Sequence, residues 1–106
     1  MGYAKYYEWC QEGHLFAETY PLRTDAPLEA MVMHEIAANL HRKMSEVNIS
    51  QAEIARQTGC AQTTISRLLA GKVLISVALL HRLNTLFGTQ LLPDEDIPNG
   101  DFDSWD

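Results

Sequence analysis

A single glycine between two short helical runs is the feature that most constrains how this chain can fold. The two runs lie in the segment 50–71, which reads SQAEIARQTGCAQTTISRLLAG. Ser50 and Glu53 have the spacing of a capping box, in which two side chains satisfy free N–H groups at a helix start. Gly59 permits the left-handed backbone that ends a helix and turns the chain sharply. The segment therefore predicts two helices joined by a tight turn and held at a steep angle.

Apolar spacing predicts further helices on both sides of this segment. From residue 28 to residue 47 the apolar side chains recur every three or four positions and form one stripe, with His34 and His41 mostly on the other faces. Ser76 is a candidate N-cap for a helix that Gly88 would close. The four expected helices span about 28–47, 51–58, 62–70 and 77–87. Because no segment of any length reads as a strand, we predict an all-α fold, a compact bundle of four to five helices with a helix-turn-helix.

The composition divides the chain into three expected parts. Residues 1–27 form an aromatic-rich N-terminal helical extension and a linker. Residues 28–92 form the helix-turn-helix domain, whose core Leu91 and Leu92 would cap. Residues 93–106 form an acidic C-terminal tail, which we expect to be mobile.

The extension itself has two parts. Residues 3–20 have aromatic and apolar side chains at helical spacing, whereas two prolines mark residues 21–27 as a linker. We expect the extension either to add to the core or to form an interface, and it could dock independently or swap onto a partner subunit. Cys10 and His14 lie four positions apart on the expected helix, but two candidate ligands do not make a zinc site, so we expect no metal.

Charge is distributed unevenly along the sequence. The 106 residues carry a formal net charge of −6, which taken alone argues against DNA binding. Six of the acidic residues lie after residue 93 without any basic residue, while residues 29–88 carry six basic and four acidic residues. Exposed charges are screened beyond about 8 Å at physiological salt, so the mildly basic central block matters more than the total.

The second helix of the glycine-linked pair has a narrow apolar side. Only Ile65 and Leu68, with Leu69 beside them, need to face inward. The remaining polar side chains can face solvent or a partner, and they are Gln62, Thr63, Thr64, Ser66 and Arg67. Arginine and glutamine can make paired hydrogen bonds with guanine and adenine edges, and a threonine methyl can contact a thymine methyl. The pattern favours DNA as the partner.

Residues 50–88 closely resemble the lambda-repressor-like helix-turn-helix domain, also called the Cro/C1 or XRE type. The matching pieces are SQAEIA, the turn TGC, QTTIS, LLAGK and SVALLHRLNTLFG. The resemblance implies a bundle of four or five helices in which helix 62–70 enters the major groove and helix 51–58 lies across the DNA backbone. One departure is Ala61, which stands where the family usually has a serine or threonine cap.

The resemblance also implies roles for individual residues. By position it assigns Gln62, Thr63 and Ser66 to bases, and it places Gln51, Arg67 and Lys72 near phosphates, with Arg67 able to serve either role. The expected DNA-binding residues are therefore Gln51, Gln62, Thr63, Thr64, Ser66, Arg67 and Lys72.

These observations predict a sequence-specific DNA-binding regulator, and the resemblance implies a repressor that binds double-stranded DNA as a homodimer. The alternative is an antitoxin or phage-type regulator whose N-terminal segment or acidic tail binds a protein partner. No nucleophile elbow, phosphate loop or paired carboxylates occur, so we expect neither an enzyme nor a cofactor. No apolar run approaches the roughly 20 residues that span a bilayer, and the start lacks a signal peptide. We expect a cytoplasmic protein.

Overall fold

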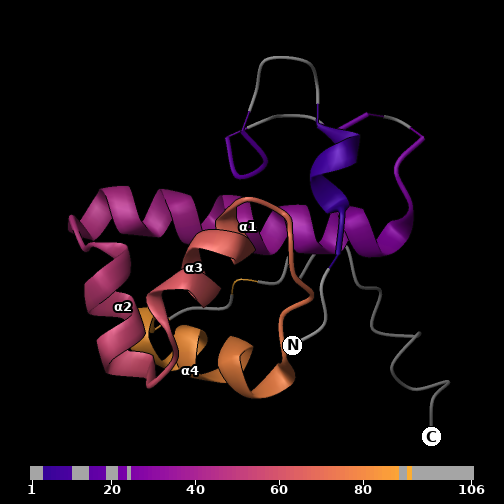
Figure 1. Cartoon of the computed structure of the whole chain (residues 1–106). Coiled ribbons are helices and arrows are strands. Elements are labelled where there is room, and N and C mark those ends of the chain that lie inside the picture. The colour runs from indigo at the N-terminus through magenta and orange to yellow at the C-terminus, as the bar shows by residue number, and fades with distance from the viewer. Residues whose placement is uncertain (1–3, 11–14, 19–21, 24, 89–90, 92–106) are drawn as a thin grey trace, which may run out of the picture.

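The structure is a computed structural model that describes residues 4–10, 15–18, 22–23, 25–88 and 91. The elements in chain order are a 3-10 helix η1 (Tyr6–Trp9) and the α-helices α1 (Leu28–Val47), α2 (Gln51–Thr58), α3 (Gln62–Leu69) and α4 (Val77–Phe87) (Figure 1). No strand occurs among these described residues. The all-α prediction is confirmed, and the four α-helices have the expected bounds except that α3 ends one residue early.

Residues with special backbone conformations separate the helices. Asn48 follows α1 with φ 55°, Gly59 follows α2 with φ 75°, and Gly88 follows α4 with φ 64°. Glycine adopts this left-handed region without steric cost, and asparagine tolerates it better than most residues. The predicted stops at Gly59 and Gly88 are therefore confirmed, and Asn48 ends α1 in the same way.

Two serines begin helices as predicted. The Ser50 hydroxyl accepts a hydrogen bond from the Glu53 backbone N–H at 3.1 Å, and the Ser76 hydroxyl accepts one from the Leu79 N–H at 3.1 Å. Ala61, before α3, has the extended backbone of an N-cap (φ −74°, ψ 147°) but no side-chain acceptor. As a consequence, α3 begins without the cap that α2 and α4 possess.

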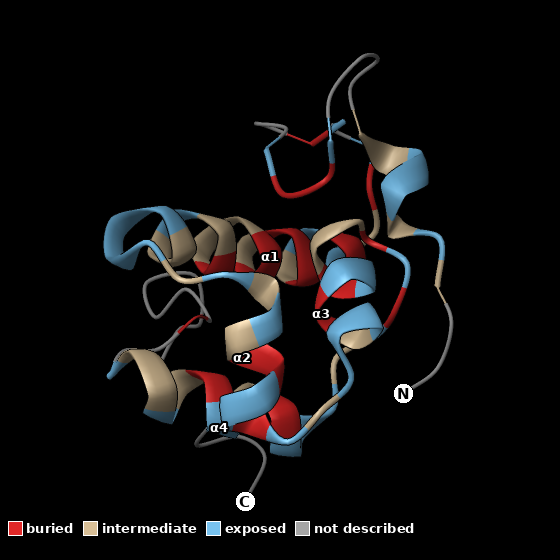
Figure 2. Cartoon of the chain, turned by 60° about the vertical axis from the view of Figure 1, so that its left-hand side comes forward, coloured by how far each residue is buried: buried red, intermediate tan, exposed pale blue. Residues whose placement is uncertain are grey.

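The long helix α1 lies between the N-terminal segment and the three shorter helices (Figures 1 and 2). The core that these elements enclose contains side chains with no exposed surface, including Leu40, Ile54, Ile65, Leu68 and Leu83. Leu91 is also fully buried: its N–H donates to Asn84 Oδ1 at 2.9 Å, and its carbonyl accepts from Asn39 Nδ2 at 2.6 Å. Leu91 thus caps the core as predicted, while Leu92 lies outside the described residues.

The N-terminal segment is not the continuous helix expected over residues 3–20. The only helix in its described part is η1, which ends where the backbone at Cys10 becomes extended (φ −68°, ψ 149°). Farther on, Phe16 and Ala17 lie in a turn and are buried, and so are Leu22 and Ala26 in the expected linker. The described residues of the segment thus contribute buried side chains from a turn and from the expected linker, and not from one helix face.

Two residues of α1 differ from the expected pattern. His34 is 3% exposed, although the spacing places it away from the apolar stripe. The Phe16 ring covers it edge-to-face, with ring centroids 5.5 Å apart, so the N-terminal segment buries this side of α1. Val47 belongs to the predicted stripe but is 57% exposed, because α1 extends past the core at that end.

Candidate nucleic-acid interface

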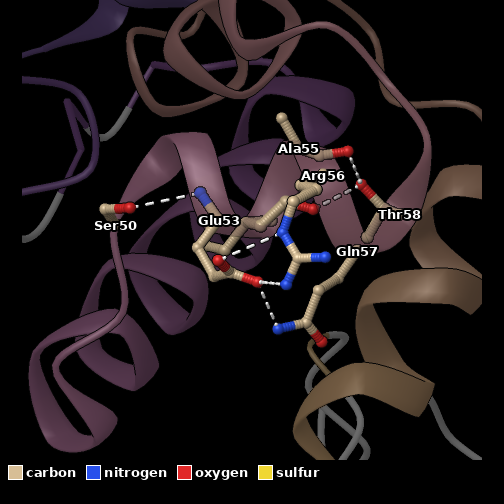
Figure 3. A network of polar contacts seen from close by, with 7 residues as sticks. Ser50, Glu53, Ala55, Arg56, Gln57 and Thr58 are labelled. Carbon is tan, nitrogen blue, oxygen red and sulfur yellow. Dashed lines mark hydrogen bonds and ion pairs between the residues drawn. The ribbon is translucent and has the colours of Figure 1, made fainter.

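A network of polar contacts organises α2 (Figure 3). The Glu53 carboxylate accepts hydrogen bonds from Arg56 Nε at 3.2 Å and from Gln57 Nε2 at 2.8 Å, and it also forms an ion pair with Arg56. The hydrogen bonds from Arg56 and Gln57 hold the pKa of Glu53 below its usual value, and Glu53 in turn raises the pKa of Arg56. In a full capping box the Glu53 carboxylate would accept the Ser50 N–H. Here it pairs with Arg56 and Gln57 of its own helix instead, so only the Ser50 half of the predicted capping box forms.

The turn after α2 is held from two sides. Gly59 N–H and Cys60 N–H both donate to the Ala55 carbonyl, at 2.9 and 3.1 Å. Arg82 of α4 donates from Nη1 to the Thr58 carbonyl at 3.2 Å. The turn is therefore held by hydrogen bonds to the last turn of α2 and by the Arg82 side chain of α4. These contacts fix the direction in which the chain enters α3.

The α3 helix buries one narrow side and exposes the rest (Figure 2). Ile65 and Leu68 have no exposed surface. The four exposed residues of the predicted DNA-binding set on this helix are Gln62, Thr63, Ser66 and Arg67, whereas Thr64 is half-buried. The structure thus brings these polar side chains together on the exposed side of α3, where their hydrogen-bond donors and acceptors are accessible to base edges.

The other two predicted residues flank α3. Gln51 is half-buried at the first position of α2, and Lys72 is exposed just beyond the end of α3. Lys72 N–H donates to the Arg67 carbonyl at 2.9 Å, and Gly71 between them adopts φ 72°. These contacts hold Lys72 at the C-terminal end of the helix, beside the exposed polar surface.

The N-terminal segment contacts this same loop, which the sequence pattern does not reveal. Ala4 N–H donates to the Lys72 carbonyl at 2.9 Å, and Tyr7 N–H donates to the Gly71 carbonyl at 3.2 Å. The Lys72 ammonium also lies 5.8 Å from the centroid of the Tyr7 ring. These contacts join positions more than 60 residues apart, so no local spacing could predict them; the aromatic content of the segment is the only signal.

Neither a metal site nor a membrane span emerges from the part of the chain that the structure describes. Within it, no three histidine, cysteine, aspartate or glutamate side chains gather as metal ligands would, and its helices are too short or too polar to cross a bilayer. Cys10 is half-buried, and burial raises the pKa of its thiol; its expected neighbour His14 lies outside the described residues.

The fold and the exposed surface together define a class of protein. Two short helices joined by a glycine turn, with the second presenting polar side chains to solvent, form a helix-turn-helix, the arrangement that places a recognition helix in the major groove of DNA.

Comparison with known families agrees with this class. A family model described as a helix-turn-helix domain matches residues 35–95, and this domain is found in XRE-like regulators. The chain belongs to this helix-turn-helix family, and its membership indicates a DNA-binding regulator. A search of curated proteins finds no match.

Proposed function

We propose that this protein is a sequence-specific transcriptional regulator that reads the major groove with α3 and represses the genes beside its binding site. The observation that carries the proposal is the division of α3 into a buried side of Ile65 and Leu68 and an exposed side with Gln62, Thr63 and Ser66. The exposed amide and hydroxyl groups can form hydrogen bonds with base edges, and the threonine methyl can contact a thymine methyl.

Individual residues have distinct proposed roles. Gln62, Thr63 and Ser66 contact bases, with Thr64 beside them. Gln51 and Lys72 contact phosphates, and Arg67 is able to contact either. Phosphate contacts position a protein on DNA, while base contacts determine which sequence is preferred.

The proposed binding unit is a homodimer. A two-fold dimer would place two α3 helices about 34 Å apart, which matches half-sites separated by one turn of DNA. The bound sequences should therefore be palindromic or nearly so. Sedimentation of the protein with a single half-site and with a full site gives the stoichiometry on each.

Selection from a random duplex library tests the central proposal. We expect one family of sequences to be enriched and binding to weaken as salt rises, because lysine and arginine release counterions from the DNA when they bind. If repeated selection enriches no sequence and binding does not depend on salt, the protein is not a DNA-binding regulator of this kind.

Two point variants test the proposed division of roles. Gln62→Ala should cost about 1–3 kcal/mol of binding free energy at the selected site and relax the preference at one base pair. Lys72→Ala should weaken binding to all sequences alike. Titration of each variant against the selected duplex and its single-base variants measures both effects, and identical behaviour of the two variants would contradict the assignment.

A second candidate is that the protein also binds a protein partner through its N-terminal side. Among the described residues, several exposed large apolar side chains belong to the N-terminal segment and the start of α1: Tyr7, Leu15, Leu28 and Met31. Replacing Leu15 and Leu28 by serine should release such a partner and leave DNA affinity unchanged. If the same proteins remain bound to the variant in equal amounts, this candidate fails.

A further inference from the structure

An open hollow lies between the N-terminal segment and the loop that links α3 to α4. Its volume is about 370 Å³, and it is lined by Ala4, Lys5, Tyr7 and Lys72. In Figure 1 the start of the described chain, in indigo, passes beside this loop. The hollow is therefore lined both by a lysine of the N-terminal segment and by a lysine three residues after the end of α3.

Backbone hydrogen bonds hold the two lysines next to each other. Ala4 N–H donates to the Lys72 carbonyl, and Tyr7 N–H donates to the Gly71 carbonyl. Lys5 lies between these two bonded positions, so its backbone is held beside the loop that carries Lys72. The Tyr7 ring lies under the Lys72 ammonium, an arrangement that favours a cation at that point. Both lysine side chains remain exposed, so their amines can reach a ligand outside the protein.

The charge of these two lysines is not balanced by ion pairs with other described residues. Several other basic side chains pair with carboxylates, and they are Arg23, Arg42, Lys43 and Arg56. No such pair involves Lys5 or Lys72 within the described part of the chain. Two exposed lysines that line one open hollow can offer their ammonium N–H groups as hydrogen-bond donors to an anion.

We propose that Lys5 and Lys72 together bind the phosphodiester backbone of DNA beside the groove that α3 enters. This inference rests on the proposed function and adds the N-terminal segment to the DNA-binding surface. The inferred ligand is a backbone phosphate because Lys72 lies three residues after the end of α3, and phosphates line both edges of the groove that we propose α3 enters. The contact carries no sequence information, since a phosphate is the same at every base pair.

The salt dependence of binding tests the proposal on the full chain. Each phosphate contact contributes about 0.9 to the slope of log K against log salt for duplex DNA. Lys5→Gln should make this slope less steep by about 0.9 and weaken binding about fivefold at 0.15 M salt, equally for the selected and for random duplexes. Lys5 is exposed, so the far-ultraviolet circular dichroism and the melting temperature of the variant should match those of the wild type.

Lys43→Gln is the matched control, because it makes the same chemical change at a lysine already paired with Glu46 at 3.2 Å on α1. Its slope should equal that of the wild type. An unchanged slope in Lys5→Gln, or an equal loss in Lys43→Gln, overturns the proposal. If the wild type itself selects no DNA, the proposed function fails. If the wild type selects DNA but Lys5→Gln leaves the slope unchanged, only the phosphate contact of Lys5 fails, so the two failures are distinguishable.

Inorganic phosphate provides a second comparison. In nuclear magnetic resonance spectra, the side-chain signals of Lys5 and Lys72 should shift when duplex DNA is added. Inorganic phosphate at the same total phosphate concentration should leave these signals unchanged. A response to inorganic phosphate without a response to duplex would assign the hollow to a free anion and overturn the proposal.

Discussion

At the scale of single residues, the contact between Phe16 and Gly71 shows how closely the N-terminal segment approaches the end of α3. A Cβ atom at position 71 would lie 2.6 Å from Cγ of the Phe16 ring, too close for any real contact. Gly71 also has φ 72°, a backbone that side chains disfavour. Position 71 therefore requires glycine for two independent reasons, whereas Gly88 requires it only for its backbone angle.

Gly71→Ala should destabilise the protein more than Gly88→Ala. The left-handed backbone costs about 1–2 kcal/mol for alanine at either position. At position 71 the collision with Phe16 adds about 1–3 kcal/mol, because the buried ring has little room to move. At position 88 no atom lies within 4 Å of the added methyl. Urea denaturation of both variants measures the difference, and equal losses would show that the ring moves freely.

The titration of the Glu53 carboxylate should make the stability of the folded protein depend on pH. Its pKa is lowered in the folded state, below the ordinary value for a glutamate, by hydrogen bonds from Arg56 and Gln57. A carboxyl group with a lowered pKa stabilises the fold when it is ionised, so its contribution is present above the ordinary glutamate pKa and is lost as the pH falls through the lower folded value.

Glu53→Gln removes this titration. The difference in unfolding free energy between wild type and variant should therefore be largest near pH 7 and should shrink as the pH falls toward 3. Urea denaturation of both proteins at several pH values gives the difference directly. A difference that stays constant with pH would mean that the ionised carboxylate does not stabilise the folded state.

At the scale of elements, local signals predicted the α-helices well. The serine caps, Asn48 and the glycines determine where the helices begin and end, and each acts through contacts with residues only a few positions away. The N-terminal segment could not be predicted in this way. Its conformation depends on Phe16 reaching His34 and on backbone bonds to the loop after α3, which are long-range contacts without a sequence period.

Ala61→Ser should stabilise α3. The backbone at position 61 already has the extended conformation of an N-cap, and the residue is exposed, so a hydroxyl can accept a free N–H of the first turn. The expected gain is about 1 kcal/mol of unfolding free energy. The same change at Ala38, inside α1, should instead cost about 0.5 kcal/mol, because serine is the weaker helix former. Thermal denaturation of both variants tests this, and a loss in both would exclude capping at position 61.

At the scale of the whole molecule, the N-terminal segment and the helices share one core. Phe16 is 2% exposed and contacts both α1 and the loop after α3, and Ala17 N–H donates to the Leu69 carbonyl at 3.1 Å. Four of the five predicted residues on α3 are exposed, as amphipathic spacing indicates, and Thr64 is half-buried. The added basic surface at Lys5 depends on tertiary contacts and could not be read from spacing.

Phe16→Ala should therefore destabilise the whole protein by about 3–5 kcal/mol, as expected for a fully buried aromatic residue. Leu15→Ala, at the neighbouring residue that is 68% exposed, should change stability by less than about 0.5 kcal/mol. Calorimetry gives both values and shows whether unfolding occurs in one transition. If Phe16→Ala does not fold, Phe16→Leu should still show a loss of about 1 kcal/mol. A second, earlier transition in either Phe16 variant would contradict a shared core.

The backbone bond between Ala4 and Lys72 has a practical consequence for anyone who prepares this protein. An affinity tag or reporter at the amino terminus would be attached to a segment whose residue Ala4 is hydrogen-bonded to the loop that follows α3. A bulky fusion at that end would compete for space with a ligand of the surface that we propose binds DNA, and a polyhistidine or basic tag would add its own attraction for DNA. Quantitative binding work should therefore use protein from which any amino-terminal tag has been cleaved.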